Sequence, residues 1–268
     1  NIGRSFEGFL GKDSFLSGEL LLMHLFINET MNESHDDQND VVIDGIYWTK
    51  TIPLLEQNSV YDVYFLNFRN MDFLGSGNSL ASYNNIGLRF SGQKDNFALE
   101  SELTLQNSSG TSSKNDVSAS LFSFNLGYKP DGIGFLNSVF LGLDRVSGDD
   151  SSTETAEGFS KEFGARHKHH GFYDYTDHKK YFGHGHDGLN EINAKANIDI
   201  LKRTNLLVAL HNFRSAVKDI YYGSEVNFIF KTKHNDEVSS EIGSVFYFPD
   251  QGNEKTLPFF YLMITADF

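Results

Sequence analysis

The amino-acid sequence predicts an all-β fold, a transmembrane antiparallel β-barrel, from three observations. Apolar and polar residues alternate along segments of about ten residues or more, which is longer than the strands typical of soluble sheets. Tight polar turns alternate with long polar connections. The last segment, residues 257–268, has one apolar face and ends on the aromatic Phe268, as the closing strand of an outer-membrane barrel does.

The composition agrees with such a barrel and argues against several other classes. The chain has 268 residues, of which 39% are hydrophobic and 14% aromatic, and a barrel needs apolar residues on only one face of each strand plus aromatic girdles. The lack of cysteine excludes disulfides, thiol catalysis and cysteine–metal clusters. The net charge of −14 argues against a nucleic-acid partner, which would require clustered Lys and Arg. We expect a mature or truncated form, because no signal peptide opens the chain.

Strand-like alternation recurs along the chain, and helical periodicity is almost absent. In one segment Ile192, Ala194 and Ala196 oppose the polar Asn193 and Lys195. We expect about thirteen strands, near residues 4–11, 15–28, 41–50, 59–69, 83–92, 97–107, 116–129, 137–147, 188–202, 205–215, 221–233, 237–248 and 257–268. A large soluble sandwich or lipocalin-like barrel would show the same alternation in shorter strands.

The connections between these segments predict how the strands cross the membrane. Tight turns are expected at residues 12–13, 93–95, 203–204 and 234–236. Long polar loops are expected at residues 29–40, 70–82, 107–116, 148–187 and 249–256. Short periplasmic turns and longer extracellular loops are the usual outer-membrane arrangement, so with Phe268 in the periplasm every long loop lies outside. Residues 148–187 then form a long, histidine-rich extracellular loop.

Several motifs resemble those of the alginate-export-type outer-membrane β-barrel family, in order along nearly the whole chain. They are Arg4-Ser-Phe-Glu-Gly8, Ile86-Gly-Leu-Arg89, Asp144-Arg-Val-Ser-Gly-Asp149, His167-Lys-His-His-Gly-Phe-Tyr-Asp174, Gly188-Leu-Asn-Glu191 and His211-Asn-Phe-Arg214.

The resemblance implies an 18-stranded monomeric barrel that exports alginate. Residues 1–268 would then be a single barrel domain that lacks about five N-terminal strands, which would explain the odd strand count. It also implies that His167, Lys168 and Asp174 order a loop over the pore.

Charged residues on the polar faces of the strands are the candidate pore lining. Alternation places these residues toward the lumen: Arg89, Glu100, Glu102, Asp144, Glu191, Lys195, Asp199, Glu225 and Lys231. Lumenal cations would suit a polyuronate, because a carboxylate polymer needs paired charge in a narrow pore. Acidic residues outnumber the cations in this set, which opposes passage of a polyanion. Alginate and a neutral or zwitterionic small solute both remain open as the transported species.

Histidines concentrate in the long loop and suggest a second kind of chemistry. His167, His169, His170, His184 and His186 could offer imidazole nitrogens to zinc, copper or nickel, and no other cofactor is expected. The alternative is an ordered loop in which His167 and Asp174 have an orienting role and the other histidines are solvated. Residues 29–40 and 148–155 are acid-rich and could hold calcium or bridge lipopolysaccharide through divalent ions; a solvated acidic face is the alternative.

These expectations combine into one functional reading with alternatives. We expect a porin-like channel of the bacterial outer membrane, in contact with lipid and lipopolysaccharide, that passes a small solute or an anionic polysaccharide. The alternatives are a structural or partner-binding barrel of a larger complex, and metal capture by the histidine-rich loop. Enzymatic activity is not expected, because no convincing catalytic constellation is present.

Overall fold

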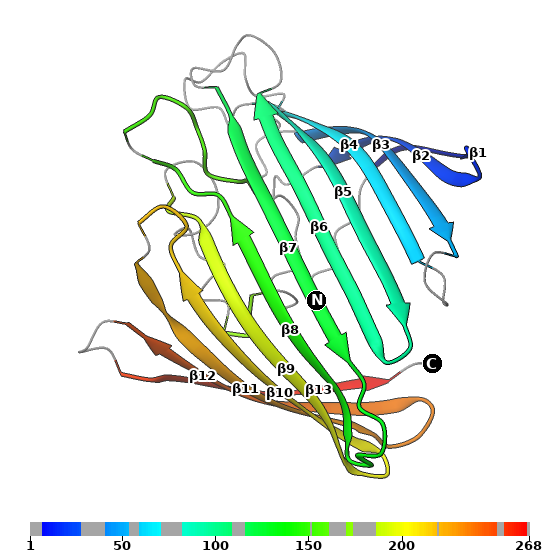
Figure 1. Cartoon of the computed structure of the whole chain (residues 1–268), viewed down its shortest axis with the longest axis vertical. Coiled ribbons are helices and arrows are strands. Elements are labelled where there is room, and N and C mark those ends of the chain that lie inside the picture. The colour runs from blue at the N-terminus through cyan, green and yellow to red at the C-terminus, as the bar shows by residue number, and fades with distance from the viewer. Residues whose placement is uncertain are drawn as a thin grey trace, which may run out of the picture.

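The computed structural model describes residues 7–27, 41–53, 59–70, 82–108, 116–150, 152–160, 170–173, 186–218, 220–250 and 255–266. Within these residues 13 strands form one antiparallel sheet in which each strand pairs with its neighbours in sequence (Figure 1). The all-β fold and the strand count predicted from the sequence are confirmed. The strands are β1 Glu7–Phe15, β2 Gly18–Ile27, β3 Val41–Ile52, β4 Ser59–Asn70, β5 Tyr83–Lys94, β6 Phe97–Ser108, β7 Ser118–Tyr128, β8 Leu136–Val146, β9 Leu189–Leu201, β10 Thr204–Arg214, β11 Tyr221–Lys233, β12 Val238–Pro249 and β13 Leu257–Ala266.

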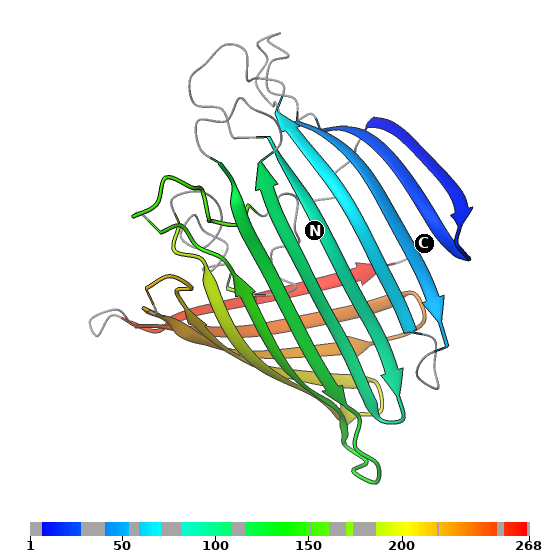
Figure 2. The same ribbon diagram turned by 45° about the horizontal axis from the view of Figure 1, so that its top comes forward.

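The sheet curls around an interior, and β1 and β13 form its two edges (Figure 2). These two strands do not pair within the described residues, so the sheet is open rather than closed. The long connections lie at one end of the strands, and the turns of the β5–β6, β9–β10 and β11–β12 hairpins lie at the other. Among the described residues, no helix is long and apolar enough to cross a membrane.

The first hairpin differs from the sequence prediction. Lys12 and Asp13, predicted as a turn, are paired in the ladder with Leu21 and Leu20. The turn lies at Leu16 and Ser17, which have φ values of 49° and 59°. Two-residue hairpin turns with positive φ at both positions favour Asn and Gly, so Leu-Ser carries no turn signal in the sequence. The second tight turn is also shifted: Lys94 ends β5, and Asp95 has a φ of 49°.

One face of the sheet carries an exposed apolar belt. Val63, Leu88, Leu103 and Phe122 are partners in register across β4 to β7, and all four side chains are exposed. A parallel row runs from β2 to β6 through Leu22, Ile46, Phe65, Ile86 and Leu105. We call this face the outer face. Such a continuous apolar surface is unusual on a soluble monomer.

A row of polar side chains borders this belt toward the long-loop end of the outer face. It runs through His24, Asp44, Asn67, Asn84 and Asn107, which are partners in register from β2 to β6. Hydrogen bonds join His24 Nδ1 to Asp44 Oδ1 at 2.6 Å and Asn67 Nδ2 to Asn84 Oδ1 at 2.7 Å. On β4 to β6 the polar row therefore marks the end of the exposed apolar residues, whereas on β2 the exposed Phe26 lies beyond it.

Tyrosines cover glycines on the opposite face, which we call the inner face. The ring of Tyr64 lies over Gly87, and that of Tyr261 lies over Gly243. Tyr64 donates a hydrogen bond to Glu102 Oε1 at 2.6 Å, and its ring stacks on Tyr47 at a centroid distance of 5.4 Å. A glycine at each covered position leaves room for a flat ring to lie along the wall, so these positions need glycine for space.

Candidate functional site on the inner face

All nine charged residues predicted to line a lumen lie on the inner face, opposite the exposed Leu, Ile and Phe side chains of their strands. Two of the three cations among them are already paired. Arg89 contacts Asp62 Oδ2 at 2.9 Å and Glu100 Oε1 at 2.7 Å, and Lys231 contacts Glu241 Oε2 at 2.9 Å. Lys195 makes no ion pair with any described residue. The inner face is thus a surface of mixed charge whose cations are largely neutralised by neighbouring acids.

Three carboxylates and a histidine from strands meet near the long-loop end of this face. Asp144 on β8 and Glu191 on β9 are direct cross-strand partners, as are His211 on β10 and Glu225 on β11. Strand alternation explains the placement, because each side chain points opposite an exposed apolar neighbour such as Leu143, Ile192 or Leu210. All four residues are buried, with relative exposures between 0% and 7%.

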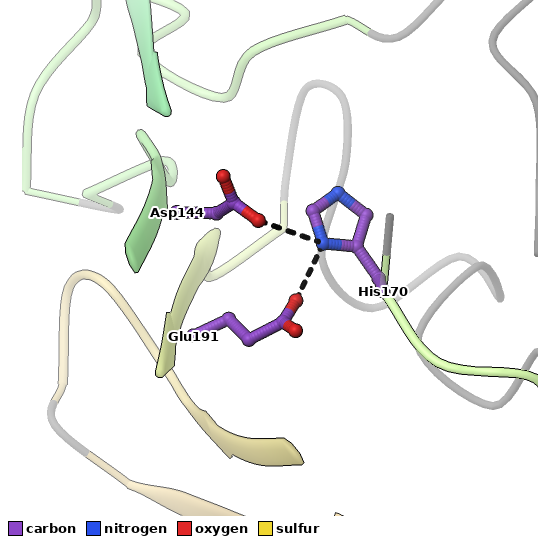
Figure 3. Close-up of side chains that lie close together, drawn as sticks. All are labelled: Asp144, His170 and Glu191. Carbon is purple, nitrogen blue, oxygen red and sulfur yellow. Dashed lines mark hydrogen bonds and ion pairs between the residues drawn. The ribbon is translucent and has the colours of Figure 1, made fainter. Parts of the chain in front are cut away.

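A short loop segment, residues 170–173, lies against these carboxylates. His170 Nδ1 lies 2.6 Å from Glu191 Oε2 and 3.9 Å from Asp144 Oδ2 (Figure 3). The backbone N–H of Phe172 donates to Glu225 Oε1 at 2.6 Å, and that of Tyr173 donates to Glu225 Oε2 at 3.3 Å. The two glutamates hold the segment at both its ends, one through a side chain and one through the backbone.

Glu191 is the centre of this arrangement because both of its oxygens are engaged. Its Oε1 accepts from His211 Nδ1 at 2.6 Å and from Asn193 Nδ2 at 3.2 Å, while Oε2 faces His170. A buried carboxylate is stable only when it is paired and hydrogen-bonded, and two imidazoles and an amide meet that need here. We call Asp144, His170, Glu191, His211 and Glu225 the inner-face cluster.

Aromatic contacts extend the segment across the inner face. Phe172 stacks on Tyr261 of β13 at a centroid distance of 6.5 Å, and Tyr173 stacks on Tyr247 of β12 at 5.6 Å. Tyr247 is fully buried and belongs to an apolar cluster at the long-loop end, with Ala119, Val146, Phe159, Leu189 and Phe213. Residues 170–173 therefore contact side chains of β8, β9, β11, β12 and β13.

A second stretch of the same connection, residues 156–160, also folds onto the sheet, whereas Ser152, Thr153 and Glu154 are exposed. Ser160 N–H donates to Gln106 Oε1 at 2.9 Å, and Gln106 Nε2 donates back to the Ser160 carbonyl at 3.2 Å. Phe159 is buried in the apolar cluster, and Ala156 forms a bridge with Val117. Near the start of this connection, the backbone N–H of Ser152 donates to Asp150 and holds the pKa of that carboxyl below its usual range. Among the described parts of the predicted loop, residues 156–160 and 170–173 thus lie against the inner face.

Not every residue of the predicted loop and metal sites can be placed. His167, Lys168, His169, Asp174 and His184 lie outside the described residues. His186 is described, and its carbonyl accepts from the Asp149 N–H at 2.6 Å, but its side chain is not part of the cluster. His170 is the one predicted metal ligand that the described structure brings to other ligating groups, and these are Asp144 and Glu191.

His211 is the member of the cluster that the sequence reasoning did not single out. The sequence does predict that His211 points inward, because it follows the apolar Leu210 and falls on the polar face of its strand. No protein-family model matches the chain, and a search of curated proteins finds no match. The resemblance to alginate-export-type barrels therefore stays a prediction that rests on the motifs.

Proposed function

We propose that the protein is a porin-like channel of the bacterial outer membrane. The single observation that carries this proposal is the apolar belt on the outer face, opposite an inner face of mixed charge. A strand of 12 residues, the length of β6, is about 40 Å long and about 30 Å tall when tilted by about 40°. That height matches the hydrocarbon core of a bilayer. The polar row from His24 to Asn107 would then lie at the membrane surface.

Residues 156–160 and 170–173 would narrow the channel from within. Both segments lie on the inner face and are held by buried polar contacts, which is the arrangement expected of a constriction rather than of a solvated outer loop. The wall around them carries paired ions, so a polyanion would meet few free cations. We propose a small neutral or zwitterionic solute as cargo, ahead of an anionic polysaccharide such as alginate.

A structural or partner-binding barrel is the second candidate, and one observation favours it. The apolar cluster around Phe159 and Tyr247 fills part of the inner face at the long-loop end. A sufficiently packed interior would leave no continuous water path, and the barrel would serve as a scaffold for its loops.

Planar-bilayer recording with the full-length protein separates the two candidates. The channel predicts discrete conductance steps and a reversal potential that shifts toward cation selectivity in Arg89→Gln and Lys195→Gln, since each change removes a positive charge from the wall. Arg145→Gln is the matched control, because Arg145 is exposed on the outer face and its loss should leave selectivity unchanged. The channel proposal would be contradicted by a lack of conductance, or by the same ion selectivity in the parent protein and in all variants.

A further inference from the structure

The geometry points to a metal site in the inner-face cluster, formed by Asp144, His170 and Glu191, that takes a divalent first-row transition ion such as Zn²⁺. One ligand comes from the loop segment and two from adjacent strands, so the ion would cross-link the constriction to the wall. This inference goes beyond the proposed channel, and ion binding can be measured whether or not the barrel conducts.

The donor atoms fit such an ion in type and in distance. An imidazole nitrogen with carboxylate oxygens suits Zn²⁺ and its first-row neighbours better than Ca²⁺ or Mg²⁺, which prefer oxygen alone. The three donor atoms lie within 4.8 Å of one another. Ligands of a tetrahedral ion with bonds of about 2.0 Å are roughly 3.3 Å apart. His170 Nδ1 lies 2.6 Å from Glu191 and 3.9 Å from Asp144, so each of these two separations would change by less than about 1 Å.

Glu191 is oriented for this role by residues that would not touch the ion. His211 and Asn193 both donate to Oε1, which fixes the carboxylate and leaves Oε2 toward His170 and Asp144. Supporting hydrogen bonds of this kind are the usual companions of metal-ligating carboxylates. Without the ion, a hydrogen bond joins His170 to Glu191 Oε2. With the ion, Nδ1 and Oε2 both bind the metal; the proton between them moves to Nε2 if the imidazole is neutral, or leaves to solvent if Nε2 already carries one.

The charge of the cluster is a second, independent sign of a cation. Three buried carboxylates, Asp144, Glu191 and Glu225, face two imidazoles, and no Lys or Arg in the described part of the chain makes an ion pair with them. The Lys195 ammonium acts on Asp144 only as a longer-range charge, so with neutral imidazoles the cluster carries an excess of negative charge, which is costly in a buried place. A divalent ion removes that excess.

Two unpartnered polar atoms, one in the cluster and one beside it, are consistent with a bound ligand. His211 Nε2 and Asn193 Oδ1 are buried and have no hydrogen-bond partner among the described residues, although the other polar atom of each side chain is bonded to Glu191. Buried polar atoms without a partner call for water or a ligand. Both atoms belong to side chains that support Glu191, so the surroundings of the proposed site have unused hydrogen-bonding capacity for water or a ligand.

Zinc binding to the refolded protein in detergent micelles tests the site, with Zn²⁺ titrated against a chromophoric chelator. Full-length protein should bind one Zn²⁺ with an affinity that falls at least tenfold in His170→Gln and in Asp144→Asn. His170 lies outside the strands and Asp144→Asn keeps the side-chain shape, so circular dichroism should show an unchanged sheet in both variants.

A variant in which His167, His169, His184 and His186 are all replaced by Gln is the control for the other loop histidines. It should keep the zinc affinity of the parent and, with Co²⁺ as probe, the visible absorption bands of the bound ion. Loss of zinc in this control would overturn the proposal, as would unchanged affinity in His170→Gln and Asp144→Asn. Absence of stoichiometric binding to the parent protein would overturn it as well.

Discussion

Gly171 lies against the carboxylate of Glu225 so closely that a Cβ atom at residue 171 would be 2.5 Å from Oε1. Its φ of +86° is also in the region that favours glycine. Space and backbone conformation thus both require glycine at the point where the loop segment meets β11. The next residue, Phe172, donates its N–H to the same oxygen. A side chain at position 171 would therefore push the segment off its anchor.

We expect Gly171→Ala to loosen residues 170–173 without disturbing the sheet. The positive φ alone costs roughly 1–2 kcal/mol for alanine, and the contact with Glu225 adds to it. Hydrogen exchange followed by mass spectrometry should show faster exchange at Phe172 and Tyr173. Gly132→Ala is the control, because Gly132 has a φ of +78° but nothing within 4 Å of its Cβ position. Equal exchange at residues 172 and 173 in the parent and Gly171→Ala would contradict the anchoring role.

Replacement of Glu191 tests the centre of the inner-face cluster. Glu191→Ala leaves the imidazoles of His170 and His211 without their shared acceptor, and breaking a buried pair of this kind costs about 3 kcal/mol or more. Urea unfolding in micelles should show this loss. Asp199→Ala, on the same strand and face but exposed, should change the unfolding free energy by less than about 0.5 kcal/mol. Similar values for the two variants would show that Glu191 is not a structural centre.

Gly87 and Tyr64 provide a test of the packing on the inner face. A Cβ atom at residue 87 would lie 2.0 Å from Tyr64 Cζ, so Gly87→Ala must displace the ring and its hydrogen bonds to Glu102 and Thr104. Overpacking of this kind typically costs about 1–3 kcal/mol. Gly11→Ala on β1 should be neutral or slightly stabilising, because its nearest neighbour would be 3.8 Å away. Thermal unfolding of both variants measures the difference, and a neutral Gly87→Ala would contradict the close packing.

The strands were predictable from the sequence because side-chain alternation reports directly on which face is exposed. The ninth strand, expected at residues 188–202, runs from Leu189 to Leu201, and the eleventh has the bounds expected for it. The first hairpin was not predictable, since its turn contains neither Asn nor Gly at the two central positions. Register there is set by pairing with β2, which no local signal reveals.

The inner-face cluster was only half predictable. Alternation placed Asp144, Glu191 and Glu225 on one face, and strand order brought their strands close together. Residue 170 belongs to a long connection without periodicity, so no pattern could show that His170 folds back onto β9. The sequence grouped His170 with the other loop histidines as candidate metal ligands or as solvated residues, and the structure brings His170 to two carboxylates of the strands.

Two equally exposed apolar residues allow a direct test of whether the outer face is inserted in a membrane. Leu103, within the belt, and Ile133, in the connection between β7 and β8, are each 43% exposed. If the outer face meets lipid, Leu103→Arg should cost about 2–4 kcal/mol in phospholipid vesicles, because it puts a charge near mid-bilayer, while Ile133→Arg costs about 0–1 kcal/mol near the interface. If the outer face meets water, both changes fall on exposed surface and should each stay within about 0.5 kcal/mol. Urea unfolding of the two variants therefore decides which solvent the belt faces, and equal small effects would contradict insertion.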